Sequence, residues 1–254
     1  MFKYYRIPDI ETAEKIIGAK PTIKFSPAND LNDPFELKFN LKIDSESEIS
    51  KELYFKEYPK NNLKDFEAWQ NGVSEGFIWQ IEQNIRNYSA STYSLACFSE
   101  SNENNLMWSH YTDNHKGICV EYSNELIEYL KLNESFFASK TVDYSDIPPA
   151  VDSFENNQNQ VVKIFFNKQS EWKYEREFRI LLRCKNETEF IKIKPEFIKS
   201  VYIGSKCDNH ISSKIIKLCN MKSIKTYHVI TLGKTYKIEF KEHREGTTYI
   251  KSFW

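Results

Sequence analysis

The chain is poor in glycine, with 7 glycines in 254 residues, and it contains neither a G-x-G-x-x-G nor a G-x-x-x-x-G-K-[ST] motif. Nucleotide sites in which the backbone of a glycine-rich loop approaches the phosphates are therefore excluded. The chain also lacks an apolar run of about 18 residues, which argues against a membrane span. Its charged start, interrupted by Pro8, is not typical of a signal peptide. We expect a cytoplasmic protein without a membrane partner, in which side chains hold any nucleotide.

The five cysteines are odd in number and widely spaced, and no two of them form a C-x-x-C pair. This pattern favours reduced thiols over structural zinc or a disulfide framework, and we expect no metal. The net charge of -1 argues against global electrostatic attraction to nucleic acid, although it leaves a local basic groove open. Aromatic residues make up 15% of the chain, which is enough to fill a sizeable core.

Hydrophobic periodicity predicts a strand over 2–7, a helix over about 10–18 and a strand over 22–26. Between 42 and 90 the apolar residues recur at helical spacing, which predicts two or three inserted amphipathic helices. Further strands are expected at 93–99, 117–123, 139–144, 175–184, 188–193, 199–204, 225–230 and 235–241, with helices near 104–112, 124–132, 152–169 and 208–219. Because helices dominate the first half and strands the second, we expect an α+β fold with mixed or antiparallel central sheets. We expect a single domain over 1–254 with the helical insertion near 42–90.

The densest group of chemically capable residues is W-K-Y-E-R-E-F-R at 172–179. On a continuous strand, Glu175, Glu177 and Arg179 share one face. Two carboxylates about 7 Å apart on such a face suit one reacting centre. One of them stabilises developing positive charge and the other acts as a base. The alternative is a solvated strand face with neighbouring opposite charges.

Polar residues end the first two strands, where Arg6 and Ser26 would point into one cleft if the strands are neighbours. The segment Asn32-Asp33-Pro34 is a turn signal, which either serves as an anchored turn or forms one wall of a pocket. In the helix expected at 104–112, Met107 and Trp108 fit the core, and His110 and Tyr111 occupy adjacent polar positions.

Together these segments resemble a bacterial family known as domain of unknown function 2971. The family pattern comprises a K-Y-R start, an S-x5-N-D-P-F-E segment, a C-F-S strand, an M-W-S-H-Y helix, a K-G-x-C/V-V/I-E-Y strand and W-x-x-E-x-E-x-R. The corresponding residues are Lys3–Arg6 (with one extra Tyr), Ser26 with Asn32–Glu36, Cys97–Ser99, Met107–Tyr111, Lys116–Tyr122 and Trp172–Arg179. The resemblance spans about residues 2–205, and the family name implies no activity.

A second resemblance, to ADP-ribosyltransferases of the R-S-E type, does imply an activity. It rests on a strand with Arg6, a short helix, a strand with Ser26, and a later strand with Glu175-x-Glu177. It implies that Arg6 holds the phosphate or ribose of NAD and that Ser26 orders the nicotinamide pocket. Glu177 would contact the nicotinamide ribose, and Glu175 would assist the acceptor. The chain departs from the fuller Ser-Thr-Ser second motif, of which only Ser26 is present.

This resemblance implies an enzyme that cleaves the nicotinamide–ribose bond of NAD and transfers ADP-ribose to a protein, a nucleic acid or water. A bacterial toxin or anti-phage effector is the expected role. A carboxylate beside the ribose stabilises oxocarbenium charge without a metal. We expect further nucleotide contacts from Tyr5, Asn32, Asp33, His110, Tyr111 and Trp172.

Two other function classes stay open at this point. A metal-dependent nuclease would use Asp33, Glu36 and Lys38 as a carboxylate cluster with a lysine. A non-catalytic ligand-sensing or interaction module would use an aromatic-rich pocket without turnover.

Overall fold

The structure is a computed structural model that describes residues 1–42, 48–72, 75–152, 156–184, 187–231 and 235–246. Its α-helices are α1 (Ile10–Ile17), α2 (Glu48–Glu57), α3 (Leu63–Gly72), α4 (Glu75–Thr92), α5 (Asn105–Tyr111), α6 (Glu125–Lys131), α7 (Asn157–Phe165) and α8 (Asn209–Asn220). Short 3-10 helices are η1 (Ala28–Asp30), η2 (Ser170–Glu175) and η3 (Pro195–Phe197). The strands are β1 (Phe2–Tyr5), β2 (Thr22–Pro27), β3 (Asn40–Lys42), β4 (Tyr93–Ser99), β5 (Ile118–Tyr122), β6 (Phe136–Thr141), β7 (Asp143–Tyr144), β8 (Ala150–Asp152), β9 (Asn167–Lys168), β10 (Glu177–Arg183), β11 (Glu189–Lys192), β12 (Ile198–Ile203), β13 (Lys225–Ile230) and β14 (Glu239–Glu242).

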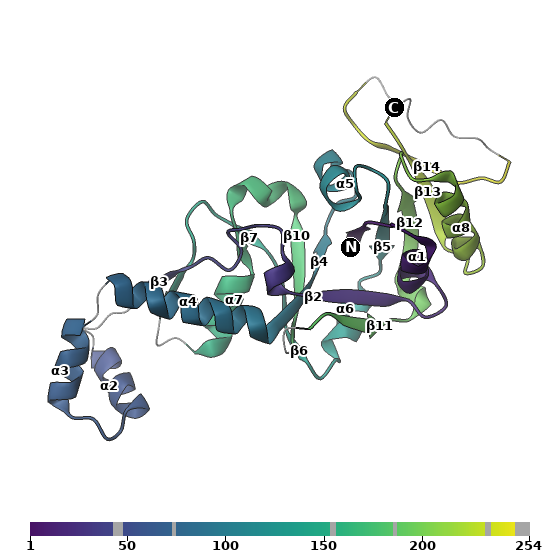
Figure 1. The fold of residues 1–254 in the computed structure, drawn as a ribbon. Coiled ribbons are helices and arrows are strands. Elements are labelled where there is room, and N and C mark those ends of the chain that lie inside the picture. Colours follow the sequence, from purple (N-terminus) through teal and green to yellow (C-terminus); the bar gives the residue numbers. More distant parts are fainter. Residues whose placement is uncertain (43–47, 73–74, 153–155, 185–186, 232–234, 247–254) are drawn as a thin grey trace.

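A large mixed sheet forms the centre of the fold (Figure 1). Its strands lie in the order β11-β2-β4-β1-β5-β12-β13-β14, and β10 and β6 extend it from β4. The pairing of β12 with β13 is parallel, whereas β4 pairs antiparallel with β1, β2 and β10. The expected α+β class with a mixed central sheet is therefore confirmed.

The sheet divides at β4. One edge of β4 pairs with β10 along its length, from Ser99 opposite Glu177 to Tyr93 opposite Arg183. The other edge pairs with β2 at Ser94 and Leu95 and with β1 at Ser99. Strands β1 and β2 therefore diverge from the same edge of β4, and the sheet forks between them.

Alternate side chains of β4 and β10 reach two separate hydrophobic cores, as the period of two in a strand requires. Ala96 and Ile180 belong to the larger core, which also contains buried residues of α1, α6 and α8. Leu95 and Leu181 belong to the second core, which includes buried residues of α7. Cys97 and Arg179 lie opposite each other in the register, on the same face as Leu95 and Leu181. Cys97 lies between the β4 residues that pair with β2 and the one that pairs with β1, so the polar part of this face lies at the fork.

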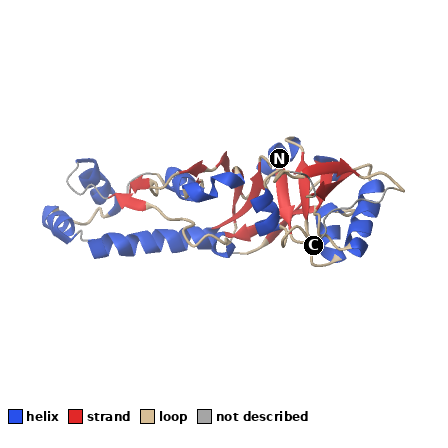
Figure 2. Ribbon diagram, turned by 90° about the horizontal axis from the view of Figure 1, so that it is seen from above, coloured by secondary structure: helices blue, strands red, loops and turns tan. Residues whose placement is uncertain are grey.

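The insertion predicted near 42–90 is helical, and it consists of α2, α3 and α4. Figures 1 and 2 show α2 and α3 at one end of the molecule, away from the main sheet, with α4 leading back toward β4. Aromatic contacts hold α2 to α3, because the Tyr54 ring lies 5.2 Å from Phe66 and 5.3 Å from Trp69. Within the described ranges, no helix is both long and apolar enough to cross a membrane.

Several expected elements differ from the structure. The strand expected at 2–7 ends at Tyr5, the one expected at 139–144 is divided between β6 and β7, and the one expected at 235–241 begins at Glu239. The strand expected at 175–184 begins at Glu177, because the chain before it forms η2 and Arg176 adopts a left-handed backbone with φ 46°. Sequence periodicity does not register this turn, since residues other than glycine rarely adopt positive φ. The helix expected at 152–169 covers only Asn157–Phe165. The Asn156 side chain caps its start by accepting from Asn159 N, and strand β9 follows from Asn167.

Gly117 provides a test of the packing at the end of β1. A Cβ atom at Gly117 would lie 1.9 Å from the backbone oxygen of Tyr5, whereas one at Gly72 would meet nothing within 4 Å. We expect Gly117→Ala to lower the free energy of unfolding by about 1 to 3 kcal/mol, because the backbone must shift. Gly72→Ala should leave it nearly unchanged. Urea unfolding of both variants measures the difference, and equal stability of Gly117→Ala and wild type would contradict the packing described.

Candidate functional site

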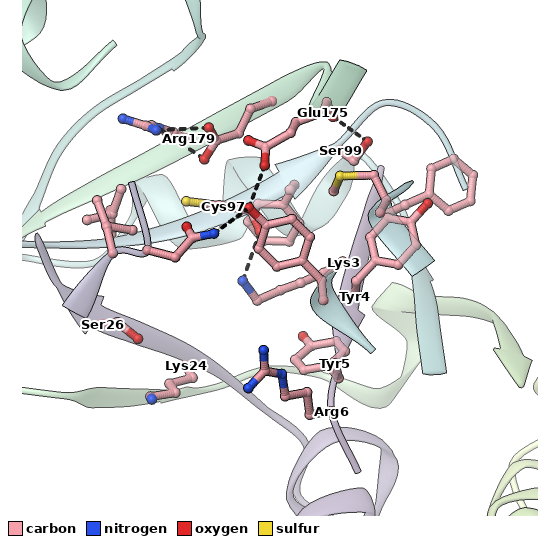
Figure 3. Close-up of a pocket in the computed structure, with 18 of the residues that line it drawn as sticks. Lys3, Tyr4, Tyr5, Arg6, Lys24, Ser26, Cys97, Ser99, Glu175 and Arg179 are labelled. Carbon is pink, nitrogen blue, oxygen red and sulfur yellow. Dashed lines mark hydrogen bonds and ion pairs between the residues drawn. The ribbon is translucent and has the colours of Figure 1, made fainter. Parts of the chain in front are cut away.

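A cavity of about 690 Å³ lies at the fork of the sheet. Figure 3 shows Arg6, Lys24 and Ser26 along one side, and Glu175 and Arg179 on the opposite side. The residues expected from the sequence that line it are Tyr5, Arg6, Ser26, Asn32, His110, Tyr111, Glu175 and Glu177. These residues come from separate parts of the chain, so the fold brings most of the expected set to one place.

The wall formed by β1, α1 and β2 is basic. Thr22, Lys24 and Ser26 all line the cavity, because alternate residues of β2 share a face. Lys3 Nζ donates to the backbone oxygen of Cys97 at 2.8 Å, and Arg6 Nη2 donates to the backbone oxygen of His110 at 3.3 Å. Burial lowers the pKa of Lys3, so the exposed Arg6 and Lys24 supply most of the positive charge of this wall, which favours an anionic ligand.

The opposite wall is organised by the buried guanidinium of Arg179, which is 1% exposed. It donates to both carboxylate oxygens of Glu177, at 3.0 and 2.9 Å. It also donates to both oxygens of Glu36, at 3.0 and 2.6 Å, and to the backbone oxygen of Phe165 at 2.7 Å. Such bidentate pairs are strong and geometrically specific, so Glu36 and Glu177 are fixed in position.

Lys168 is the second cation of this buried cluster. Its Nζ lies 2.7 Å from Glu175, 3.5 Å from Glu36 and 3.7 Å from Glu177. The same nitrogen lies 4.5 Å from the ring centroid of Trp172, which is a cation–π distance. Three carboxylates therefore share two cations, and the cluster holds one excess negative charge when all five groups are ionised.

Glu175 is held differently from Glu177, although both line the cavity. The hydroxyl of Tyr111 donates to Glu175 Oε1, and Lys168 donates to Oε2. Asn32 Nδ2 in turn donates to the hydroxyl oxygen of Tyr111 at 3.3 Å. A hydrogen-bonded chain thus runs from Asn32 through Tyr111 to Glu175.

The pKa values of the two carboxyl groups are shifted in opposite directions. Burial alone would raise the pKa of Glu177, but the charges of Arg179 and Lys168 lower it to about 2. Burial raises the pKa of Glu175, and together with the smaller repulsion by Glu177 it outweighs the lowering by Lys168. Although burial alone would lower the pKa of Lys168, the surrounding carboxylates raise it. Glu177 is therefore a permanent anion near neutral pH, and Glu175 is the carboxyl suited to take up a proton.

Two of the residues expected at the site do not line the cavity. Asp33 accepts a hydrogen bond from Phe35 N at 2.9 Å, so it stabilises the turn. Trp172 lies in η2 against Lys168.

Glu36, which the nuclease alternative assigned to a metal, instead binds Arg179 through both oxygens. Among the residues that the structure describes, no group of three His, Cys, Asp or Glu side chains is placed to hold a metal ion.

Several lining residues were not expected from the sequence. Lys24 could have been found, because it shares a strand face with Ser26. Lys3 and Cys97 lie within the boxes Lys3–Arg6 and Cys97–Ser99 but were assigned no role. Lys168 lies outside the W-K-Y-E-R-E-F-R segment, and although Glu175 is near it in the chain, Glu36 is brought to it only by the fold.

The opposite pKa shifts of Glu175 and Glu177 predict opposite effects of pH on the free energy of unfolding. The pKa of Glu177 falls from 4.5 to about 2 on folding, which corresponds to about 3 kcal/mol. This stability is present above pH 4.5 and is lost as the pH falls toward 2. The destabilisation caused by Glu177→Gln should therefore be largest near pH 7 and should shrink in acid.

For Glu175, ionisation opposes folding, so wild type loses stability as the pH rises above 4.5. The free energy of unfolding of Glu175→Gln relative to wild type should therefore rise with pH above 4.5. Urea unfolding from pH 3 to pH 8 checks both signs, and parallel pH curves for the two variants would contradict them.

Residues 107–180 match the model of a family described as a protein of unknown function (DUF2971). The match includes the boxes Met107–Tyr111, Lys116–Tyr122 and Trp172–Arg179, and the boxes nearer the N-terminus lie outside it. Comparisons with curated proteins and with solved structures give no match. The family resemblance read from the motifs is thus confirmed over residues 107–180, where the chain is similar to the DUF2971 family.

Proposed function

We propose that this protein is an ADP-ribosyltransferase-like enzyme that cleaves the nicotinamide–ribose bond of NAD and transfers ADP-ribose to an acceptor. The observation that carries the proposal is the convergence of Arg6, Ser26 and Glu177 at one cavity. Arg6 follows β1, Ser26 lies on β2 and Glu177 begins β10. Three separate segments thus supply the three residue types that the R-S-E resemblance implies, around a forked sheet that we propose to be the corresponding core.

The charge distribution of the cavity supports NAD as the substrate. NAD carries a positive nicotinamide ring at one end and a negative diphosphate in the middle. The basic wall with Arg6 and Lys24 suits the diphosphate, and the wall with Glu175 and Glu177 suits the nicotinamide end. A volume of about 690 Å³ lies within the range of ligand pockets, about 300 to 1,000 Å³.

The chemistry follows from the state of Glu177. When the C1′–N bond breaks, its electron pair leaves with nicotinamide, and positive charge develops on the ribose ring. A carboxylate that is ionised and held by Arg179 needs no reorganisation to stabilise that charge. Holding the phosphates by side chains also agrees with the absence of a glycine-rich loop from the sequence.

Nicotinamide release from NAD by the purified full chain tests the proposal. Glu177→Gln should lower kcat about 100-fold or more, since the carboxylate stabilises the transition state. Arg6→Ala, at an exposed position, should raise KM without loss of folding. Glu100→Gln is the matched control, because Glu100 pairs with Arg176 at the surface and does not line the cavity. Nicotinamide release that is unaffected by Glu177→Gln and Arg6→Ala would contradict the proposal, and NAD binding without any turnover would favour the sensing module.

We also propose that the activity serves a bacterial toxin or anti-phage effector in the cytoplasm, because uncontrolled NAD cleavage removes a central cofactor. Expression of the wild-type chain should then slow bacterial growth and lower cellular NAD. Expression of Glu177→Gln to the same level should do neither. Healthy growth with undiminished NAD in cells that produce the wild-type chain would count against this role.

A further inference from the structure

Glu175 is buried, as Glu177 is, and a hydrogen bond from Tyr111 connects it to the cavity. The residue is 2% exposed, and its two carboxylate oxygens are taken by Tyr111 and Lys168. Tyr111, by contrast, is half-buried and lines the cavity, and it also lies close enough to Glu177 to experience its charge. The hydroxyl of Tyr111 therefore provides a hydrogen-bonded route from a molecule in the cavity to Glu175.

The orientation of that hydroxyl is fixed by its neighbours. A tyrosine hydroxyl has one hydrogen and two acceptor lone pairs. Its hydrogen is directed to Glu175 Oε1, and one lone pair accepts from Asn32 Nδ2 at 3.3 Å. One lone pair remains, and it can accept a hydrogen bond from a donor in the cavity.

We propose that Tyr111 is a catalytic residue that relays a proton from a hydroxyl acceptor to Glu175, so that the acceptor class is water or an alcohol. The inference rests on the proposed cleavage of NAD. Lys168 and Asn32 act as positioning residues, since they hold Glu175 and Tyr111 respectively. A hydroxyl group fits the remaining lone pair because it is neutral, donates one hydrogen and becomes a nucleophile when that hydrogen leaves.

The step balances without another reactant. The acceptor oxygen forms a bond to ribose C1′, from which nicotinamide has departed with the electron pair of the broken bond. The acceptor proton passes to the Tyr111 oxygen as the tyrosine proton passes to Glu175 Oε1. Tyr111 is neutral before and after the transfer, so it needs no ionised state, and Glu175 ends protonated. Glu175 then returns its proton to solvent.

Two reactions of NAD separate this relay from the cleavage itself. In nicotinamide exchange, isotope-labelled nicotinamide attacks C1′ and regenerates NAD, and no proton has to be removed. In hydrolysis, water attacks the same carbon and must lose a proton. Both reactions require Glu177, but hydrolysis alone requires the relay.

The decisive experiment measures both rates for the wild type, Tyr111→Phe, Glu175→Gln and Glu177→Gln. We expect Tyr111→Phe to lower hydrolysis about 100-fold or more, as loss of a general base does, with exchange close to the wild-type rate. Glu175→Gln should show the same selective loss, so the test does not depend on a single variant. Glu177→Gln should lower both rates. Tyr88→Phe is the matched control and should change neither, because Tyr88 is exposed on α4 and does not line the cavity.

The outcomes distinguish a failure of the proton relay from a failure of the proposed NAD cleavage. Equal losses of exchange and hydrolysis in Tyr111→Phe, or no loss in either, would overturn the relay while leaving NAD cleavage in place. Absence of both reactions in the wild type would overturn the proposed function and the relay with it. A thermal unfolding curve for each variant shows that the rates refer to folded protein.

Discussion

The buried guanidinium of Arg179 is the constraint on which the rest of the site depends. It is almost inaccessible to solvent, and a buried charge persists only when partners compensate it. Its partners are Glu177 on its own strand, Glu36 after β2 and the backbone of Phe165 at the end of α7. One side chain thus ties the forked sheet to the segment after β2 and to the helix of the second core.

This arrangement leaves the site with a surplus of carboxylate. Arg179 takes up Glu36 and Glu177, and Lys168 is left to balance Glu175. As a result, one carboxylate stays ionised and the other has a raised pKa, within the same cavity. Pairs of carboxyl groups whose environments separate their pKa values are typical of acid–base chemistry. On this account the ion cluster both stabilises the fold and divides the roles of the two glutamates.

The sequence predicted most elements and much of the site, because strand and helix periods are local properties. Ser26 and Lys24 share a face that can be read directly from β2. The position of Glu175 was predicted wrongly, since Arg176 turns the chain with a left-handed backbone that glycine or asparagine would normally signal. The fork itself could not be predicted, because it depends on β1 and β2 both pairing with the same edge of β4. Lys168 was missed for a similar reason: Glu36, one of its partners, is brought to it only by the tertiary fold.

The most direct test of the central claim is a crystal structure of the protein with a non-cleavable carbocyclic analogue of NAD. We expect the analogue to occupy the cavity at the fork, with its diphosphate against Arg6 and Lys24 and its nicotinamide-side ring against Glu177. Binding at another surface, or in the reverse orientation with the diphosphate against Glu175 and Glu177, would contradict it.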